Sequence, residues 1–232
     1  MLSKIIKRIP LLRRIVRKPQ GGAEQSPSIP HGPKGIEQVG HRQYVGGRWD
    51  EIGELQYSFL TSQGLSCDDV LCDVACGSLR GGVHFIKHLN AGNYLGIEKE
   101  QQLLEAGKSE VGEKLWSEKQ PELVCSDSFE FTKFSRTANW ALAQSLFTHL
   151  PEEIIIDCLE KLRAWMGDGV FYATFFECDE PQENPETPHD HGGWYYTREQ
   201  METFGRKAGW KCQYIGDWKH PRNQQMMRYS TS

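Results

Sequence analysis

The sequence predicts an α/β fold in which a mostly parallel sheet is covered by helices on both faces. Short apolar runs with the length of buried strands alternate with longer stretches whose apolar residues recur every three or four positions. Strands that alternate with helices pair in parallel and are buried on both sides. Only the stretch "CQYIGDWKHPRNQQMMRY" holds two strand-like runs with no helix between them, which predicts a hairpin at the end of the sheet.

The alternation of strand-like and helix-like stretches predicts the order of the strands and helices along the chain. Strands are predicted near residues 70–74, 94–98, 122–126, 140–144, 170–175, 211–216 and 225–229. A first helix precedes them and carries an apolar stripe of Trp49, Ile52, Leu55, Phe59 and Leu60. Further helices are predicted near residues 80–89, 100–117, 151–166 and 198–208.

Two of these helices carry boundary signals. Pro151 suits a first helical position, Glu152 suits the positive end of the helix dipole, and Gly167 suits the C-terminal stop. Thr197 and Gln200 have the spacing of a capping box ahead of the last helix. Local sequence therefore defines where both helices begin.

Composition divides the chain into three parts. Residues 1–20 contain seven basic residues and no acid, so a net charge of −4 for the chain leaves −11 on the remainder. Their apolar residues fall at helical spacing but Pro10 interrupts them, which is compatible with contact to an anionic membrane surface, docking on a partner, or a solvated tail. Residues 21–40 are rich in Pro, Gly and Ser and are predicted to be a flexible linker, and residues 41–232 form the folded domain.

The same composition excludes several classes of protein. An acidic domain argues against nucleic-acid binding. The seven cysteines form no Cys-x-x-Cys pair and lie mostly in apolar runs, as reduced buried thiols do in the cytoplasm. No apolar stretch approaches the roughly 18 residues that cross a bilayer. The expected location is the cytoplasm, at the inner face of a membrane if residues 1–20 bind lipid.

The stretch "VLCDVACGSLRGG" predicts a cofactor site. Asp73 ends a strand, and the glycines that follow let the backbone approach a ligand ahead of a helix N-terminus. A carboxylate at this position would repel the pyrophosphate of a dinucleotide, whereas S-adenosylmethionine offers an ammonium and a sulfonium. Arg80 is available for the carboxylate of that cofactor.

Two further acids end the next two strands. Glu98 follows the second strand, 25 residues after Asp73, where a carboxylate can accept from both ribose hydroxyls. Asp127 follows the third strand, where it can accept from the adenine amine with Phe129 against the ring. Three acids at successive strand ends support an adenosyl cofactor more strongly than any one of them does.

The motifs "DVACGSLRGG", "YLGIEKE", "CSDSFEF" and "WALAQSLFTHLP" resemble those of class I S-adenosylmethionine-dependent methyltransferases, from about Val45 to the C-terminus. The resemblance implies a Rossmann-like sheet of seven strands with a reversed last strand, and cofactor contacts from Gly77, Gln144 and residue 75. Ala75 stands where the family often has glycine.

Candidates for catalysis and acceptor binding follow the fourth and fifth strands. His149, in "AQSLFTHL", is the first candidate for a general base and otherwise packs ahead of the next helix. The polar stretch "TFFECDEPQENPETPHDHGGWYYT" is either a loop that covers the cavity or a solvated loop. Its candidates for acceptor binding are His189, His191, Trp194 and Tyr195. The "HDH" triplet lacks a third ligand at a recognisable spacing, so no metal is expected.

The sequence thus predicts methyl transfer from S-adenosylmethionine to a small molecule or a glycan, at an oxygen atom. One alternative is an NAD(P)-dependent oxidoreductase or epimerase, disfavoured by Asp73 and by the lack of a Tyr-x-x-x-Lys pair. The other is a catalytically inactive module that binds cofactor. No residue identifies the acceptor or the oligomeric state.

Overall fold

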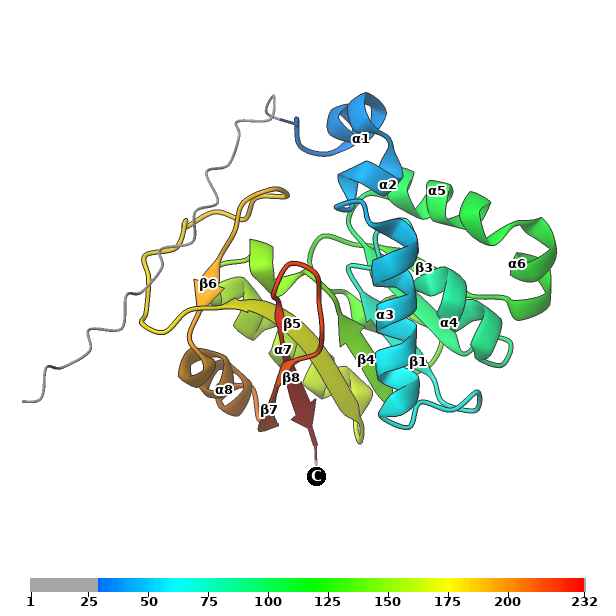
Figure 1. Ribbon diagram of the computed structural model, residues 1–232. Coiled ribbons are helices and arrows are strands. Elements are labelled where there is room, and N and C mark those ends of the chain that lie inside the picture. Colours follow the sequence, from blue (N-terminus) through cyan, green and yellow to red (C-terminus); the bar gives the residue numbers. More distant parts are fainter. Residues whose placement is uncertain (1–28, 232) are drawn as a thin grey trace, which may run out of the picture.

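A computed structural model describes residues 29–231 (Figure 1). Residues 1–20, predicted to be a basic amphipathic segment, lie outside the described residues, as does the first part of the predicted linker. No helix within residues 29–231 is long and apolar enough to cross a membrane.

One twisted sheet organises the described chain. In order along the sequence its strands are β1 (Leu71–Val74), β2 (Tyr94–Glu98), β3 (Glu122–Cys125), β4 (Trp140–Ala143), β5 (Val170–Glu177), β6 (Tyr195–Tyr196), β7 (Lys211–Asp217) and β8 (Gln225–Ser230). Their spatial order is β3-β2-β1-β4-β5-β8-β7, and the two-residue β6 pairs with the end of β5. Only β8 runs antiparallel to its neighbours, which confirms the predicted mostly parallel sheet with a reversed last strand.

Helices cover both faces of this sheet (Figure 1). On one side lie α3 (Trp49–Ser62), α4 (Gly82–His88) and α5 (Gln101–Val111), whose Leu60, Phe85 and Leu104 share a core cluster with Leu71 of β1. On the other side lie α7 (Glu152–Met166) and α8 (Arg198–Lys207), packed in a second cluster with Cys72. Leu71 and Cys72 face opposite sides because side chains alternate along a strand.

The helix boundaries follow the sequence with two corrections. Pro151 is the N-cap of α7 and not its first helical residue. The capping box of Thr197 and Gln200 is present, and α7 ends at Gly167. The single helix predicted over residues 100–117 is wrong, because Gly112 adopts φ +80° and divides it into α5 and α6 (Glu113–Lys119). A residue in this left-handed region cannot continue an α-helix, and glycine adopts it without steric cost.

The segment before α3 is also more ordered than predicted. Residues 33–39, part of the predicted linker, form α1 (Pro33–Val39), and α2 (His41–Tyr44) follows. Pro33 occupies the start of the helix, where its missing N–H costs nothing. Ile36 and Tyr44 form a small core with Leu103 of α5, so apolar burial anchors this Pro- and Gly-rich segment.

Candidate active site

A cavity of about 660 Å³ opens at the carboxyl ends of the parallel strands. Its walls come from the turn after β1, the ends of β2, β3 and β4, the segment around Tyr44, and the loops that follow β5 and β7. Open parallel sheets bind ligands at this edge, where the strand order reverses between β1 and β4.

Asp73 is a buried carboxylate at the floor of the cavity. It is 3% exposed, and the Tyr94 hydroxyl donates to its Oδ2 over 2.7 Å. Burial raises the pKa of Asp73 to about 7, against the opposing effects of that hydrogen bond and of Arg80. A buried carboxylate without an ion-pair partner favours a ligand that brings a positive charge to it.

The turn after β1 brings its backbone close to the cavity. Ala75 adopts φ +58° and Gly77 adopts φ +55°. A Cβ at residue 77 would lie 2.9 Å from the Val45 side chain, so glycine is required there for space as well as for conformation. Ala75 accepts the left-handed conformation in spite of its methyl group, and both residues line the cavity.

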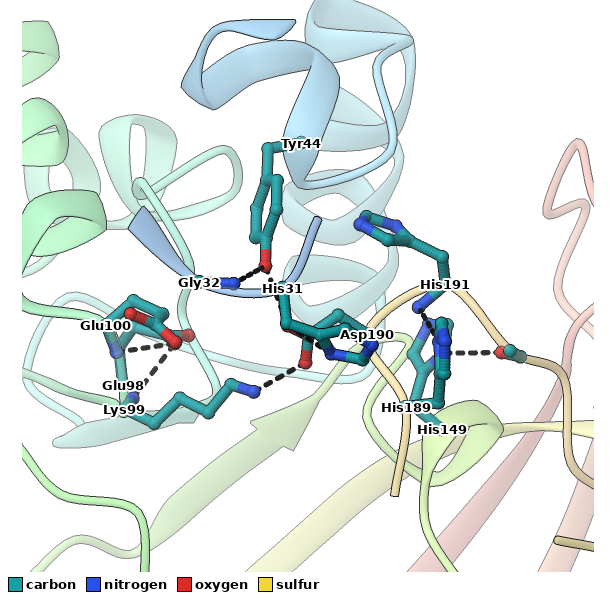
Figure 2. A network of polar contacts seen from close by, with 11 residues as sticks. His31, Gly32, Tyr44, Glu98, Lys99, Glu100, His149, His189, Asp190 and His191 are labelled. Atoms are coloured by element: carbon teal, nitrogen blue, oxygen red, sulfur yellow. Dashed lines mark hydrogen bonds and ion pairs between the residues drawn. The ribbon is translucent and has the colours of Figure 1, made fainter. Parts of the chain in front are cut away.

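Glu98 is held in place by the backbone. Its carboxylate accepts hydrogen bonds from three amides, those of Gly77 at 3.1 Å, Lys99 at 2.9 Å and Glu100 at 3.1 Å. Figure 2 shows the bonds from Lys99 and Glu100. Burial raises the pKa of Glu98, and these three donors counteract the rise. The amides fix the orientation of the carboxylate towards the cavity that it lines.

Asp127 lies beyond the end of β3. Its side chain is exposed and lines the cavity together with Ser126 and Phe129. Phe129 adopts φ +56°, an uncommon conformation for a large side chain. The three predicted acids therefore open onto one cavity, two of them buried and the third at its solvent-accessible side.

Arg80 and Gln144 form a buried pair in the cavity wall. The guanidinium of Arg80 donates to the Gly47 carbonyl over 2.9 Å and to Gln144 Oε1 over 2.6 Å. Because Arg80 can only donate, the amide nitrogen of Gln144 faces His220 Nε2 at 3.2 Å and Gln224 Oε1 at 3.3 Å. Both ends of the Gln144 amide are thus used by protein groups, and its side chain orients Arg80.

His149 ends the short 3₁₀ helix η2 (Phe147–His149) after β4. Its Nδ1 lies 2.7 Å from the Gly192 carbonyl, which requires the proton on Nδ1 and leaves the Nε2 lone pair available (Figure 2). Burial lowers the pKa of His149, so the imidazole is neutral at neutral pH. Residue 149 lines the cavity in the protonation state of a general base.

The loop after β5 supplies three of the four predicted acceptor residues. His189, His191 and Tyr195 line the cavity, and the ring of Tyr195 stacks on Phe176 with centroids 5.3 Å apart. The prediction that Trp194 lines the cavity is wrong. Its side chain is fully buried in the core and its indole N–H donates to the Pro185 carbonyl over 2.9 Å, because its large apolar ring gains more from the core than from the cavity wall.

Asp190, between the two histidines, joins three segments of the chain (Figure 2). It accepts from the Tyr44 hydroxyl over 2.7 Å and from the Lys99 ammonium, and His31 Nδ1 lies 3.4 Å away. Partial burial would raise the pKa of Asp190, but the bonds from Lys99 and Tyr44 hold it at about 2. Sequence reasoning missed Tyr44, Lys99 and Asp190, and only the neighbouring histidines drew attention to this loop.

No group of three or more His, Cys, Asp or Glu residues within residues 29–231 is arranged to hold a metal ion. The His-Asp-His triplet instead contributes to ring and ion-pair contacts, among them His31 against His189 with centroids 4.2 Å apart.

Comparison of the fold with solved structures finds several methyltransferases, all distant in sequence. The magnesium protoporphyrin IX methyltransferase ChlM from Synechocystis PCC 6803, with bound S-adenosylhomocysteine (SAH), is 12% identical with a TM-score of 0.59, over 82% of this chain and 92% of that chain. CalS10 from Micromonospora echinaspora, an amino pentose methyltransferase with bound S-adenosylmethionine (SAM), is 13% identical with a TM-score of 0.59, over 82% and 94%.

Human N-acetylserotonin methyltransferase, in complex with SAM, is 13% identical with a TM-score of 0.62, over 85% of this chain and 58% of that chain. No protein-family model and no curated protein sequence matches the chain. At these identities the likeness concerns the fold.

Proposed function

Because the chain has the fold of SAM-dependent methyltransferases, we propose that it transfers a methyl group from SAM to a small molecule or a glycan, at an oxygen atom. The observation that carries the proposal is the convergence of Asp73, Glu98 and Asp127 on one cavity at the ends of successive strands. This arrangement suits a cofactor that combines a cation, a ribose and an adenine.

The residues of the cavity fit each part of that cofactor. Asp73 offers a buried carboxylate to the ammonium, and Arg80 offers a guanidinium to the carboxylate of the methionine moiety. Glu98 keeps one acceptor site, on Oε2, for a ribose hydroxyl after accepting its three backbone bonds, since an ionised carboxylate has about four acceptor sites. Asp127 and Phe129 are placed for the adenine.

Bound SAM would supply an electrophilic methyl group on a sulfonium. Displacement at such a methyl is in line, so the protein contributes mainly by holding the acceptor opposite the leaving sulfur. His149 is the group proposed to take the proton of an acceptor hydroxyl, through Nε2. Phe176 and Tyr195 provide an apolar wall for the acceptor in the same cavity.

The small-molecule acceptor class agrees with the structural neighbours. ChlM acts on magnesium protoporphyrin IX and CalS10 on an amino pentose, according to their names. A cavity of about 660 Å³ that also holds the cofactor leaves room for an acceptor of modest size.

The oxidoreductase or epimerase alternative is less compatible with the cavity. The carboxylate of Asp73 sits where the pyrophosphate of NAD(P) would approach the turn after β1, and no basic side chain contacts it within hydrogen-bond distance in the described chain. The inactive-module alternative differs from our proposal only in turnover, and the neutral His149 in the cavity favours an enzyme.

Thermal unfolding with added ligands tests the cofactor. SAH at a hundredfold excess over its Kd should stabilise the protein by about 2.7 kcal/mol, which corresponds to a Tm increase of roughly 5–10 °C for a domain of this size. NAD at the same concentration should leave Tm unchanged. Equal stabilisation by NAD, or none by millimolar SAH, would overturn the cofactor assignment.

Turnover is tested separately with SAM carrying a labelled methyl group. We expect label to enter the small-molecule fraction of a cell extract with the wild-type protein and not with Asp73→Asn. If SAH binds but no extract ever accepts label, the chain is a cofactor-binding module.

For location we propose the cytoplasm, with contact of residues 1–20 to an anionic membrane face. Seven basic residues alternate there with Leu, Ile and Val, and no acid opposes them. The interaction would serve to concentrate the enzyme near its acceptor.

A further inference from the structure

Two arginines line the cavity away from Glu98 and Asp127, and neither forms an ion pair within residues 29–231. Arg80 follows the turn after β1, and Arg222 belongs to the loop between β7 and β8. All ion pairs of the described arginines involve Arg42, Arg48, Arg198 and Arg206. Both guanidiniums at this end of the cavity therefore lack a compensating carboxylate within ion-pair distance.

The partners of Arg80 are neutral. Its side chain is 6% exposed and donates only to the Gly47 carbonyl and the Gln144 amide oxygen. Burial lowers its pKa to about 10, and the nearby positive charge of Arg222 contributes to this shift. A buried cation bonded to neutral groups alone favours binding of an anion beside it.

Arg222 is held by the segment that also binds Arg80. Its guanidinium donates to the Gly46 carbonyl, which ties the loop between β7 and β8 to the segment before α3. A neighbouring cation, Arg48, is paired with Glu51 over 2.9 Å. Arg222 therefore contributes a positive charge that is fixed in position.

The neutral side chains around Gln144 are paired with one another in the described chain, and the donor that they leave for a ligand is the Ser145 hydroxyl. Gln224 uses its amide oxygen on the Thr174 hydroxyl, at 2.8 Å, and on Gln144, so its amide nitrogen donates to Ser145 Oγ. Ser145 Oγ accepts that bond and keeps its own hydrogen, and the residue lines the cavity at φ +66°. His220 contacts the Gln144 amide nitrogen through Nε2 and the Arg222 backbone N–H through Nδ1, and burial and the surrounding arginines lower its pKa to about 4.

The proposed cofactor brings one carboxylate to this end of the cavity, and Arg80 is the arginine adjacent to the cofactor-binding turn. The guanidinium of Arg222 then remains without an anionic partner in the described chain. We propose that the acceptor carries an anionic oxygen group, a carboxylate or a phosphate, that Arg222 binds with help from the Ser145 hydroxyl in the same cavity. This inference rests on the proposed function and narrows its acceptor to anionic small molecules.

The test uses benzoate and its neutral isostere benzamide as probes, titrated calorimetrically into the full-length protein saturated with SAH. Benzoate should bind about tenfold or more tightly than benzamide, as expected for a charge-assisted bidentate contact. In Arg222→Gln this preference should fall to within about twofold, whereas Arg222→Lys, which keeps the charge, should retain part of it. Arg198→Gln removes an exposed arginine on α8 and should behave as wild type.

A second comparison shows whether Arg222 binds the carboxylate of the cofactor or that of the acceptor. It uses SAH and 5′-methylthioadenosine, which lacks the amino-acid moiety. Arg222→Gln should leave the Kd values of both within about threefold of wild type. A selective loss of SAH affinity would assign Arg222 to the cofactor and overturn the inference, as would equal binding of benzoate and benzamide. If SAH itself fails to bind the wild type, the proposed function fails instead.

Discussion

The cavity has two halves that are built in different ways. The cofactor half consists of the end of β1 with the turn after it and the ends of β2 and β3. Asp73 and Glu98 lie near the carboxyl ends of β1 and β2, and Asp127 lies two residues beyond β3. The acceptor half consists of residues 29–48, the loop of residues 178–194 and the loop of residues 218–224. Its contacts join distant parts of the chain, as Tyr44 does with Asp190 and Arg222 with Gly46.

This difference affects how freely the sequence of each half can change. The sheet fixes the cofactor half through buried strands, whereas the acceptor half is held by a small apolar cluster, by the buried Trp194 and by polar contacts between loops. Loops tolerate changes in sequence that buried strands do not. A single cofactor chemistry can thus be combined with different acceptors, and substitutions in the two halves should affect different quantities.

Asp73→Asn should have the largest effect on the cofactor half. The amide keeps the shape of the side chain but removes the buried charge, and loss of one partner from a buried charge pair costs about 3–5 kcal/mol. The Kd for SAH, measured by calorimetry, should rise at least a hundredfold. Asp157→Asn, at the exposed surface of α7, is the matched control. A loss of less than threefold would remove Asp73 from the cofactor site.

The same carboxylate predicts a pH dependence. With a pKa of about 7 in the free protein, Asp73 is partly protonated at pH 6, and the ligand ammonium favours its ionised form. SAH affinity should therefore increase from pH 6 to pH 8 in the wild type and stay flat in Asp73→Asn. Without ligand the folded state binds the extra proton, so the contribution of Asp73 to stability should fall as pH rises from about 4 to about 7.

Glu98→Gln should have the second largest effect. The substitution keeps an acceptor for the backbone amides but removes the charge that strengthens a ribose hydrogen bond, worth about 1.5–3 kcal/mol. We expect SAH to bind roughly 10- to 100-fold more weakly, with Glu118→Gln on exposed α6 as control. Glu98→Ala is less informative, because it would also leave three amide donors without their acceptor. An unchanged Kd for Glu98→Gln would show that the carboxylate only orders the backbone.

Tyr44→Phe tests the acceptor half. The hydroxyl links the Gly32 amide, at 2.7 Å, to Asp190, so its removal should cost about 0.5–1.5 kcal/mol locally. Hydrogen exchange should become faster in residues 29–45 and 186–193 while β1 and β2 keep their protection. Tyr57→Phe, on α3, provides a comparison outside the cavity. Faster exchange throughout the sheet would mean that the two halves unfold as one unit.

Deletion of residues 1–20 should have the smallest effect on the cavity. The Kd for SAH should stay within about twofold, since sites without shared partners act independently. Sedimentation with anionic vesicles should be lost, because each basic residue near such a surface contributes about 1 kcal/mol, and full-length protein should dissociate from vesicles at high salt. Identical sedimentation of both proteins at low salt would leave the segment without a role at membranes.

Much of the cofactor half could be predicted from sequence because its acids lie at the ends of strands. Asp73, Glu98 and Gly77 are adjacent to strands with clear apolar patterns, so their place at the edge of the sheet follows from the order of elements. Tyr44 and Asp190 meet only in the folded chain, and no local pattern indicates such a contact. The prediction that Trp194 lines the acceptor site failed because the residues around it in the loop are polar, whereas its own ring is buried in the core.

The position of β8 has a consequence for how the protein is synthesised. β8 lies between β5 and β7, although both precede it in the chain, and Val170 pairs with Ser230 across the sheet. As the nascent chain leaves the ribosome, β7 has no partner strand until β8 emerges, whereas β1 to β4 already have their neighbours. We therefore expect co-translational folding to complete the proposed SAM-binding edge first and to add Arg222 and its loop last.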